Sequence, residues 1–550
     1  MKKILCLFAI AIMVVSCGKK NPESAYIPKD AVGVMYMNLG SLAEKSSNID
    51  FKNLSIGKMF EQNAPREVKK LMNETLTAEN MNAAFRKDFI LGFMTLDRML
   101  PSGGLVIPIK DGAAFENMIT PMIEKAPGIK KQEKVGKGEA FTVYSNREMA
   151  IGWNNETALV VVAREYADQD LIDMTNLEAS ENINATNYFK DFFDASKDMG
   201  MHISSTPMST IADSFATGML GLDIDSKNNN FTYYGSFEDD YMHAQMKMNL
   251  NPVIKSVIGY DSWLATDYDA NLLNVIPENS AMVMKMSFDF PALYEHFKSL
   301  PDNEALPEKI RKELKRGIER ADGQSKGAAG MTPEEVFGIF GGSMVMGVTE
   351  GKVVKDSIRD YYSDDVEYRV FESKVPNVYA AVAIKDMEKF EKLMGLGMMF
   401  LRPEEKGKNY YQMYGDNFMI LKDNMLYFTN DESKADEVAN NGKLAANLSN
   451  FKHKSKLDSS IYIYSSPNAS SVMGDFLSSM NPYENLYKTG DTKSSYELMS
   501  DYFGESHLTI GTDGMESFTY MKGEGNSLER MIMYMNANIE EMMKMMAQFR

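Results

Sequence analysis

The sequence predicts an α+β fold made of two tandem homologous halves, each a largely antiparallel sheet with packed helices, plus a C-terminal amphipathic helix. Three observations predict it: one internal repeat, turn residues placed as in β-hairpins, and apolar residues at helical spacing. The 550 residues are 44% hydrophobic and 25% charged, a globular composition. Because single cores stop growing near roughly 250–300 residues, this length predicts more than one domain.

The internal repeat is the strongest of these observations. Ile27-Pro28 precedes the apolar segment 32–39, and Ile276-Pro277 precedes the matching segment 281–288. Further markers follow in the same order in both halves, and an ordered series indicates duplication rather than chance. The markers pair as Ile109-Lys110-Asp111 with Ile384-Lys385-Asp386, Phe115-Glu116 with Phe390-Glu391, Ile203-Ser204-Ser205 with Tyr464-Ser465-Ser466, Leu222 and Ile224 with Leu508 and Ile510, and Phe231-Thr232-Tyr233 with Phe518-Thr519-Tyr520.

The chain begins with a bacterial lipoprotein signal. Lys2 and Lys3 precede twelve mostly apolar residues, 4–15, and Ser16-Cys17 follows. A basic start, a short apolar stretch and a small residue before the cleavage point are typical of a secretory signal, and the cysteine makes it the lipoprotein type. Twelve residues are too few to span about 30 Å of hydrocarbon. We therefore expect lipidation, palmitate included, at Cys17.

Four segments follow from the signal and the repeat. They are a signal peptide over 1–16, a lipidated tether over 17–24, a first α+β repeat domain over 25–268 and a second over 269–550 that includes the C-terminal helix. The second mature residue, Gly18, is not the aspartate that often retains lipoproteins at the inner membrane. We therefore expect an outer-membrane protein, anchored on the periplasmic face, with the cell surface as the alternative.

In the first half, the Ile-Pro segment predicts a strand, followed by a short helix over 41–46 and a charged helix over 65–72. Asp111 is a predicted N-cap, and Phe115, Met118, Ile119, Met122 and Ile123 then share one helical face. Strands are predicted at 140–145, 149–153 and 157–162. An Asn154-Asn155 turn joins the last two, and the segment 226–230 forms a later hairpin turn.

The second half repeats this pattern, with a helix from Pro307 to Ala321, an N-cap at Asp386 and turns at Asp423-Asn424 and Asp513-Gly514. A polar stretch over 349–375 has no counterpart in the first half. It predicts a solvated loop or hairpin, with a binding loop as the functional alternative. Its tyrosines are Tyr361, Tyr362 and Tyr368. The chain ends in a predicted amphipathic helix over 527–548, which we expect to pack on the second half through Leu528, Met531, Met535, Ile539, Met542, Met546 and Phe549.

Charge and cysteine content exclude several classes of function. The formal net charge of −18 disfavours binding to nucleic acid and electrostatic binding to anionic lipid. Cys6 leaves with the signal peptide and Cys17 carries the lipid, so no thiol is left for a disulfide, a zinc site or a nucleophile. The protein must be stabilised by core packing.

Methionine is abundant, with 45 residues, several of them in the C-terminal helix. Thioethers are soft ligands that suit Cu(I), which makes a copper-binding protein one alternative. The structural alternative is that methionine replaces leucine as an adaptable core residue. We favour it, because the methionines of the C-terminal helix recur at helical spacing and no histidine lies near them in the sequence.

No catalytic constellation is apparent. The five histidines, His202, His243, His296, His453 and His507, form no closely spaced pair in the sequence. A nucleophile elbow, a phosphate-binding glycine loop and a dinucleotide fingerprint are all missing. We therefore predict no catalytic, cofactor-binding or metal-ligating residue, and no cofactor.

The lipobox, the length and the Ile-Pro opening of each half resemble the large lipoproteins of Bacteroides and its relatives that form domain-of-unknown-function family 4836. The resemblance covers nearly the whole mature chain. It implies a bacterial envelope lipoprotein and supplies no catalytic residues.

The sequence thus predicts a non-enzymatic, lipid-anchored envelope protein that binds a partner. The expected partners are the membrane, through the acyl chains on Cys17, and an outer-membrane protein complex or an envelope polymer. The alternative from another class is a periplasmic hydrolase with a site between the halves. A pocket of converging Asp, Glu or His would favour the enzyme, and a broad apolar face would favour binding.

Overall fold

A computed structural model describes residues 21–550, except 56, 59–65, 67–69, 71–73, 76, 98–99, 125–127, 187–188, 190–191, 195, 210–212, 214–225, 360–367, 402, 481–492 and 549–550. The predicted signal, Cys17 and most of the helix expected over 65–72 lie outside the described residues. The chain divides into two compact units. Unit 1 comprises Met1–Met219, Asp225–Phe237 and Met246–Asn251, and unit 2 comprises Leu220–Ile224, Glu238–Gln245 and Pro252–Arg550.

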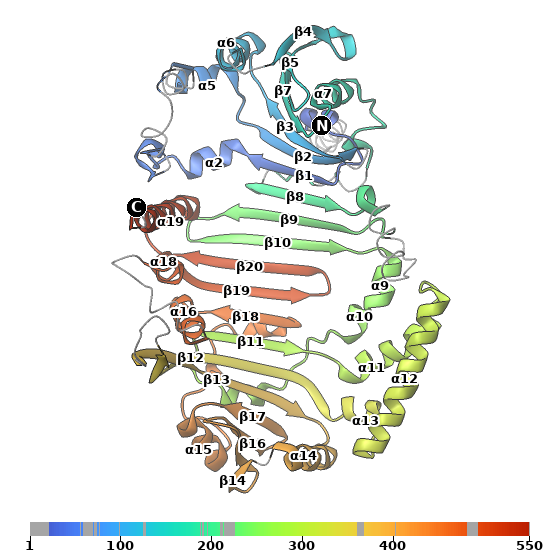
Figure 1. The fold of residues 1–550 in the computed structure, drawn as a ribbon, viewed down its shortest axis with the longest axis vertical. Helices are drawn as coiled ribbons and strands as arrows, with labels where there is room; N and C mark the ends of the chain where they lie inside the picture. Colours follow the sequence, from blue (N-terminus) through green and yellow to red (C-terminus); the bar gives the residue numbers. More distant parts are fainter. Residues whose placement is uncertain are drawn as a thin grey trace, which may run out of the picture. The chain divides into compact units, whose positions relative to one another are not determined.

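Unit 1 is built on antiparallel strands in the order β4-β5-β6-β7-β3-β2-β1-β8-β9 (Figure 1). The strands are β1 Gly33–Asn38, β2 Phe89–Asp97, β3 Leu100–Pro108, β4 Lys130–Val135, β5 Phe141–Ser145, β6 Met149–Trp153, β7 Thr157–Ala163, β8 Met199–Ser204 and β9 Asn230–Phe237. The helices are α2 Leu39–Lys45, α5 Ala78–Ala84, α6 Gly112–Ile123 and α7 Ala167–Asn176.

Unit 2 repeats this topology in the order β14-β15-β16-β17-β13-β12-β11-β18-β19-β20. Its strands are β11 Met282–Ser287, β12 Phe340–Arg359, β13 Tyr368–Ile384, β14 Glu404–Gly407, β15 Tyr410–Gln412, β16 Phe418–Lys422, β17 Met425–Thr429, β18 Ile461–Ser465, β19 Phe503–Gly511 and β20 Gly514–Met521. The first residues of β10, Tyr241–Asn249, belong to it as well. The predicted α+β fold with tandem antiparallel halves is confirmed.

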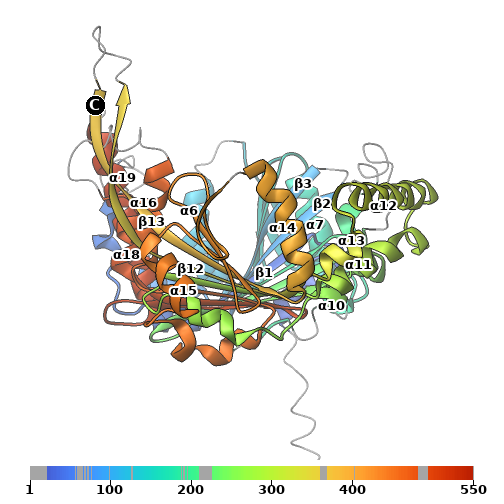
Figure 2. The same cartoon turned by 90° about the horizontal axis from the view of Figure 1, so that it is seen from below.

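The helices of unit 2 are α9 Pro252–Ile258, α10 Tyr260–Trp263, α11 Phe290–Ser299, α12 Glu308–Ala329, α13 Pro333–Phe337, α14 Met387–Leu401, α15 Glu432–Asn441, α16 Ala469–Met480, α18 Ser495–Tyr502 and α19 Ser527–Gln548. Figures 1 and 2 place α16, α18 and α19 at one end of the strands and α10 to α13 at the other.

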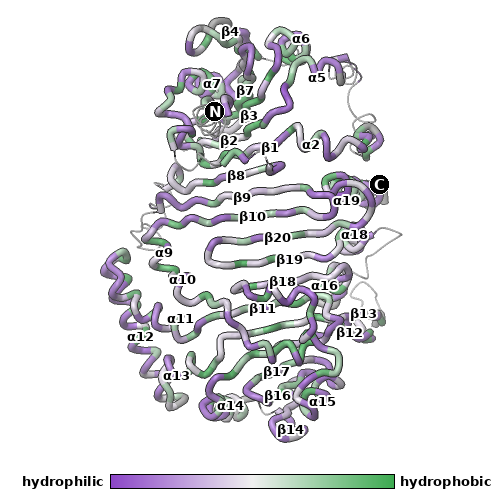
Figure 3. Tube along the Cα trace, turned by 180° about the vertical axis from the view of Figure 1, so that it is seen from behind, coloured by the Kyte–Doolittle hydropathy of each residue, from purple (hydrophilic) through white to green (hydrophobic). Residues whose placement is uncertain are grey.

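Each unit buries apolar side chains on both faces of the outer part of its sheet. In unit 1, α7 covers one face through Leu171, and α6 covers the other through Phe115 and Met118. In unit 2, α15 and α14 take the same places. Figure 3 shows the hydrophobic residues along β13, β16 and β17 and mainly hydrophilic residues along α12. The result is a helix–sheet–helix sandwich in each unit, which is how a two-sided apolar sheet excludes water.

The predicted helix starts are confirmed. The carboxylate of Asp111 accepts the backbone N–H groups of Ala113 and Ala114, and that of Asp386 accepts the N–H of Lys389. These bonds satisfy donors that the first helical turn otherwise leaves unpaired. Phe115, Met118 and Ile123 are buried, as their spacing predicts.

The polar stretch over 349–375 is a hairpin. The ends of β12 and β13 pair from Lys352–Val375 to Arg359–Tyr368. Figure 2 shows this hairpin projecting from the rest of unit 2. Tyr361 and Tyr362 lie outside the described residues.

One marker of the repeat was misaligned. Residues 231–233 lie in β9, which pairs with β8 as β19 pairs with β18, so they correspond to β19 and not to β20. The next hairpin turn of the chain is at 238–240, between β9 and β10, and the segment 226–230 does not form it. A three-residue match is too short to fix register against the pairing of whole strands.

The C-terminal helix has the predicted bounds but packs through a different face. Met535, Met542 and Met546 are 47%, 48% and 57% exposed, whereas Glu529, Arg530 and Glu541 are buried. The Arg530 guanidinium donates to the backbone carbonyl of Met521, and Glu541 accepts the N–H of Lys493. These polar contacts orient the helix, which the apolar pattern alone does not predict.

Candidate functional site

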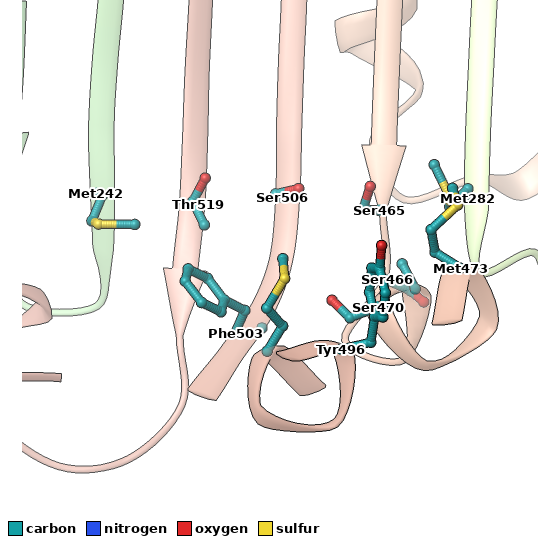
Figure 4. Close-up of a pocket in the computed structure, with 13 residues that line it drawn as sticks. Met242, Met282, Ser465, Ser466, Ser470, Met473, Tyr496, Phe503, Ser506 and Thr519 are labelled. Carbon is teal, nitrogen blue, oxygen red and sulfur yellow. The ribbon is translucent and has the colours of Figure 1, made fainter. Parts of the chain in front are cut away.

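A hollow with an uncharged lining lies in unit 2, where α16 and α18 pack near the ends of β18, β19 and β20 (Figure 4). Its volume is about 420 Å³. Most of the lining residues carry a small hydroxyl or a flexible thioether, and the full lining is Met242, Met282, Ser465, Ser466, Ala469, Ser470, Met473, Tyr496, Met499, Phe503, Gly504, Ser506 and Thr519. We call this the methionine–hydroxyl pocket.

The floor of the pocket is one row of residues across neighbouring strands. Met282 pairs with Ser465, Ser465 with Ser506, and Ser506 with Thr519. Because side chains alternate between the two faces of a strand, directly paired residues project on the same face. The register therefore sets three hydroxyl groups side by side, with a methionine on β11 next to them.

The walls come from two short helices. Ala469, Ser470 and Met473 project from α16, and Tyr496 and Met499 from α18. Helix α18 begins with a capping box, in which Ser494 and Glu497 satisfy each other's backbone N–H groups. Gly474 allows the close approach of the helices, because a Cβ there would lie 3.0 Å from the Cβ of Tyr496.

The lining of this pocket is uncharged. No aspartate, glutamate, histidine, lysine or arginine is among its lining residues, so it offers no general acid or base at neutral pH. Methionine side chains adapt to irregular apolar shapes, and hydroxyl groups both donate and accept hydrogen bonds. The lining suits a largely apolar ligand with an uncharged polar part.

Unit 1 presents a more apolar version of the same sheet face. Met35, Met201, Ile203 and Phe231 lie on it and are between 38% and 41% exposed. Ile203 and Phe231 pair with each other at the positions that Ser465 and Ser506 hold in unit 2. Exposed apolar groups gathered on one face are typical of interaction surfaces.

A second cluster in unit 2 contains titratable groups. His453 precedes the short 3₁₀ helix Lys454–Asp458, and Glu505 and His507 lie on β19. The Nε2 atoms of His453 and His507 are 3.5 Å and 3.6 Å from the two carboxylate oxygens of Glu505. His507 is buried, and the other two are largely buried. We call this the His–Glu–His cluster, and these are the described residues best placed to hold a metal ion.

Burial lowers the pKa of His507 to about 4 and also lowers the pKa of His453. Burial raises the pKa of Glu505, but the hydrogen bond and charge of Lys452 hold it below its usual value. The histidines are therefore neutral and the carboxylate is ionised at pH 7, which are the forms that bind metal.

The structure thus brings together two histidines that the sequence keeps far apart. The rings of His453 and His507 lie 4.2 Å apart, centroid to centroid. The other histidines do not join them: His202 lies in unit 1, His243 contacts Glu516 and His296 contacts the carbonyl of Val257. No signal in the sequence marked the pair, because the tertiary fold brings the loop residue His453 against His507 on β19.

No protein-family model matches the sequence, and no curated protein matches it. Solved structures of TP0453 are distantly similar. Crystal forms I and III share 10% and 11% identity with this chain, cover 42% and 44% of it and 81% and 86% of their own length, and have a TM-score of 0.24. In the part of the chain that the structure describes, no helix combines the length and the apolar character needed to cross a membrane.

Proposed function

We propose that this chain is a lipid-anchored bacterial envelope lipoprotein that acts by binding, and that its methionine–hydroxyl pocket takes the acyl part of a neutral lipid. The observation that carries the proposal is the pocket itself, with about 420 Å³ of space and no charged lining residue. Ligand pockets of this kind are mostly apolar, with a few placed polar groups.

The charge of the lining supports a neutral ligand. A phosphate or carboxylate headgroup would meet no cation among the lining residues, and the chain as a whole is acidic. An ester or hydroxyl group could instead hydrogen-bond to the row of Ser465, Ser506 and Thr519. The acyl chain would lie against Met242, Met282, Met473 and Met499.

The anchor places the protein where such ligands occur. The signal over 1–16 and Cys17 support attachment to the outer membrane through acyl chains, on the periplasmic face. The resemblance to domain-of-unknown-function family 4836 agrees with an envelope lipoprotein. An outer-membrane protein complex is the macromolecular partner we propose, and the exposed apolar face of unit 1 supports one.

The test is binding of the neutral fluorescent probe N-phenyl-1-naphthylamine to the purified full chain, followed by displacement with monopalmitoylglycerol. Ser470→Trp fills the pocket from α16, and we expect it to weaken probe binding about tenfold or more, because the probe would lose the space it occupies.

Ser471→Trp is the matched control. Ser471 is the next residue of α16, is exposed and does not line the pocket, so this variant should bind as the wild type does. Equal binding by both variants, or a probe that monopalmitoylglycerol does not displace, would contradict the proposal.

A further inference from the structure

We propose that His453, Glu505 and His507 form a binding site for a divalent transition metal ion of the zinc type, independent of the methionine–hydroxyl pocket. Two imidazole nitrogens and one carboxylate oxygen form a donor set that zinc accepts in proteins, with a fourth position left for water. Calcium and magnesium prefer oxygen donors alone, and Cu(I) prefers thiolates and thioethers, so this set disfavours both classes.

The distances fit one ion held by all three side chains. Two donors bound to one tetrahedral zinc ion at about 2.0–2.1 Å lie roughly 3.3–3.4 Å from each other. The Nε2 atom of His453 lies 3.5 Å from Oε2 of Glu505, and that of His507 lies 3.6 Å from Oε1. One ligand atom from each of the three residues lies within 4.8 Å of the others. Both nitrogen–oxygen separations exceed an ordinary hydrogen bond of about 2.7–3.2 Å.

His453 has a buried ring nitrogen that is available as a metal ligand. Its Nε2 atom is buried and makes no hydrogen bond. Buried polar atoms are normally paired, and an unpaired one calls for an explanation such as an ion. A metal ion at the cluster would satisfy this nitrogen.

A second layer of side chains orients the ligands. The Tyr462 hydroxyl lies 2.8 Å from Nδ1 of His507, so that ring can bind a metal through Nε2 while Nδ1 donates to the tyrosine oxygen. The rings of Phe451 and Tyr464 pack around His453. The aromatic walls lower the local polarity, and the partly exposed edges of His453 and Glu505 leave a route from solvent.

Lys452 forms an ion pair with the carboxylate of Glu505. Its Nζ atom lies 2.5 Å from Oε2 of Glu505, and its side chain is 63% exposed. A long exposed side chain can swing into water at little cost, so a cation of higher charge can replace it. The lysine and the metal therefore compete for Glu505, and removal of the lysine should strengthen metal binding.

Unit 1 is an internal comparison. His202 and Thr232 pair on β8 and β9 as Tyr464 and His507 pair on β18 and β19. The residue two before Thr232 is Asn230, which takes the place of Glu505. Among the described residues of unit 1, Asn230 and Thr232 therefore stand at the positions of Glu505 and His507. The proposed site belongs to unit 2.

The experiment is titration of the full chain, prepared without a histidine tag and freed of metal, with Zn²⁺ by calorimetry. Co²⁺ is then used as a spectroscopic probe of tetrahedral nitrogen–oxygen coordination. We expect one Zn²⁺ per chain. His453→Ala and Glu505→Gln should each weaken binding about tenfold or more, and Lys452→Gln should strengthen it.

His243→Gln is the matched control, because His243 also contacts a glutamate in unit 2 but has no second histidine beside it. It should bind Zn²⁺ as the wild type does. Near-ultraviolet circular dichroism checks that each variant is folded, and His453 is partly exposed, so its replacement leaves the core intact. Unchanged Zn²⁺ affinity in folded His453→Ala and Glu505→Gln, or no Zn²⁺ binding by either the wild type or Lys452→Gln, would overturn the proposal.

Discussion

At the scale of single residues, the two units fill one equivalent pair of positions differently. Tyr36 on β1 pairs with Gly200, and Lys285 on β11 pairs with Tyr462. A Cβ at Gly200 would lie 2.2 Å from the Tyr36 ring, so only glycine leaves room for that tyrosine. Unit 2 instead buries two large side chains, Lys285 and Tyr462, at this pair of positions.

Lys285 is fully buried although it is charged. Its ammonium donates to the carbonyl oxygens of Thr266 and Ser459 at 3.2 Å and 2.7 Å, and it lies 5.2 Å from the centre of the Tyr268 ring. Burial lowers its pKa to about 8. The backbone carbonyls thus compensate part of the desolvation of the cation.

A pH dependence of stability follows from His202 in unit 1. It is 3% exposed, its Nδ1 lies 2.9 Å from the Thr232 hydroxyl, and burial lowers its pKa from 6.5 to about 4. Between pH 6.5 and 4 the unfolded chain binds a proton that the folded chain does not. Stability should therefore fall as the pH falls through this range, by about 1.4 kcal/mol per pH unit for one proton, and show no contribution from this group above it.

Urea denaturation between pH 7.5 and 4.5 measures this dependence. His202→Gln should flatten the curve relative to the wild type, and His296→Gln provides a histidine substitution elsewhere in the fold. The same slope in all three proteins would refute the assignment to His202.

At the scale of elements, two similar predicted turns have different geometry. Asp423 and Asn424 form a two-residue hairpin turn with φ of 51° and 57°, between the paired residues Lys422 and Met425. At the equivalent turn of unit 1, the Asn154 side chain accepts the N–H groups of Glu156 and Thr157. Asn155 has no positive φ. Asparagine serves both geometries, because it tolerates left-handed backbone and caps turns with its side chain.

The turn of unit 2 gives a test of this distinction. Asn424→Ala should cost about 1 kcal/mol, because alanine is disfavoured in left-handed backbone, and Asn424→Gly should be neutral or stabilising. Shifts in the urea denaturation midpoint measure both effects. Asn155→Ala is the control and should change stability less than Asn424→Ala, and equal losses would show that the positive φ is not the cause.

The sequence predicted most elements because their signals are local. Turn residues, N-caps and alternating strands identified β5, β6, β7, α2 and α19 close to their observed bounds, and they identified the starts of α6 and α14. The buried face of α19 was wrong, because the contacts of Arg530 and Glu541 with distant backbone decide it. Such contacts leave no periodic pattern in the sequence.

At the scale of the whole molecule, one topology carries two different surfaces. Both units have the same strand order, yet unit 1 exposes Ile203 and Phe231 where unit 2 has Ser465 and Ser506. Only unit 2 contains the His–Glu–His cluster among the described residues. Duplication preserved the core and allowed the exposed positions of each unit to diverge, since exposed residues are constrained less by packing.

The anchor can be tested on the intact chain in cells. Cys17→Ser should abolish incorporation of labelled palmitate and release the protein from the membrane fraction, because the lipid has no other attachment residue once the signal is removed. Lys19→Ser, two residues away, should leave labelling and fractionation unchanged. Palmitate incorporation by Cys17→Ser would contradict lipidation at this position.

The sequence by itself determined the fold class, the tandem repeat and the expected lipoprotein signal, because these depend on composition, spacing and residues close together in the chain. The tertiary structure alone decided the two candidate sites. The methionine–hydroxyl pocket needs the register that aligns Ser465, Ser506 and Thr519, and the His–Glu–His cluster needs a loop and a strand separated by about fifty residues. Both sites consist of residues that are unremarkable in sequence and become neighbours only through the tertiary fold.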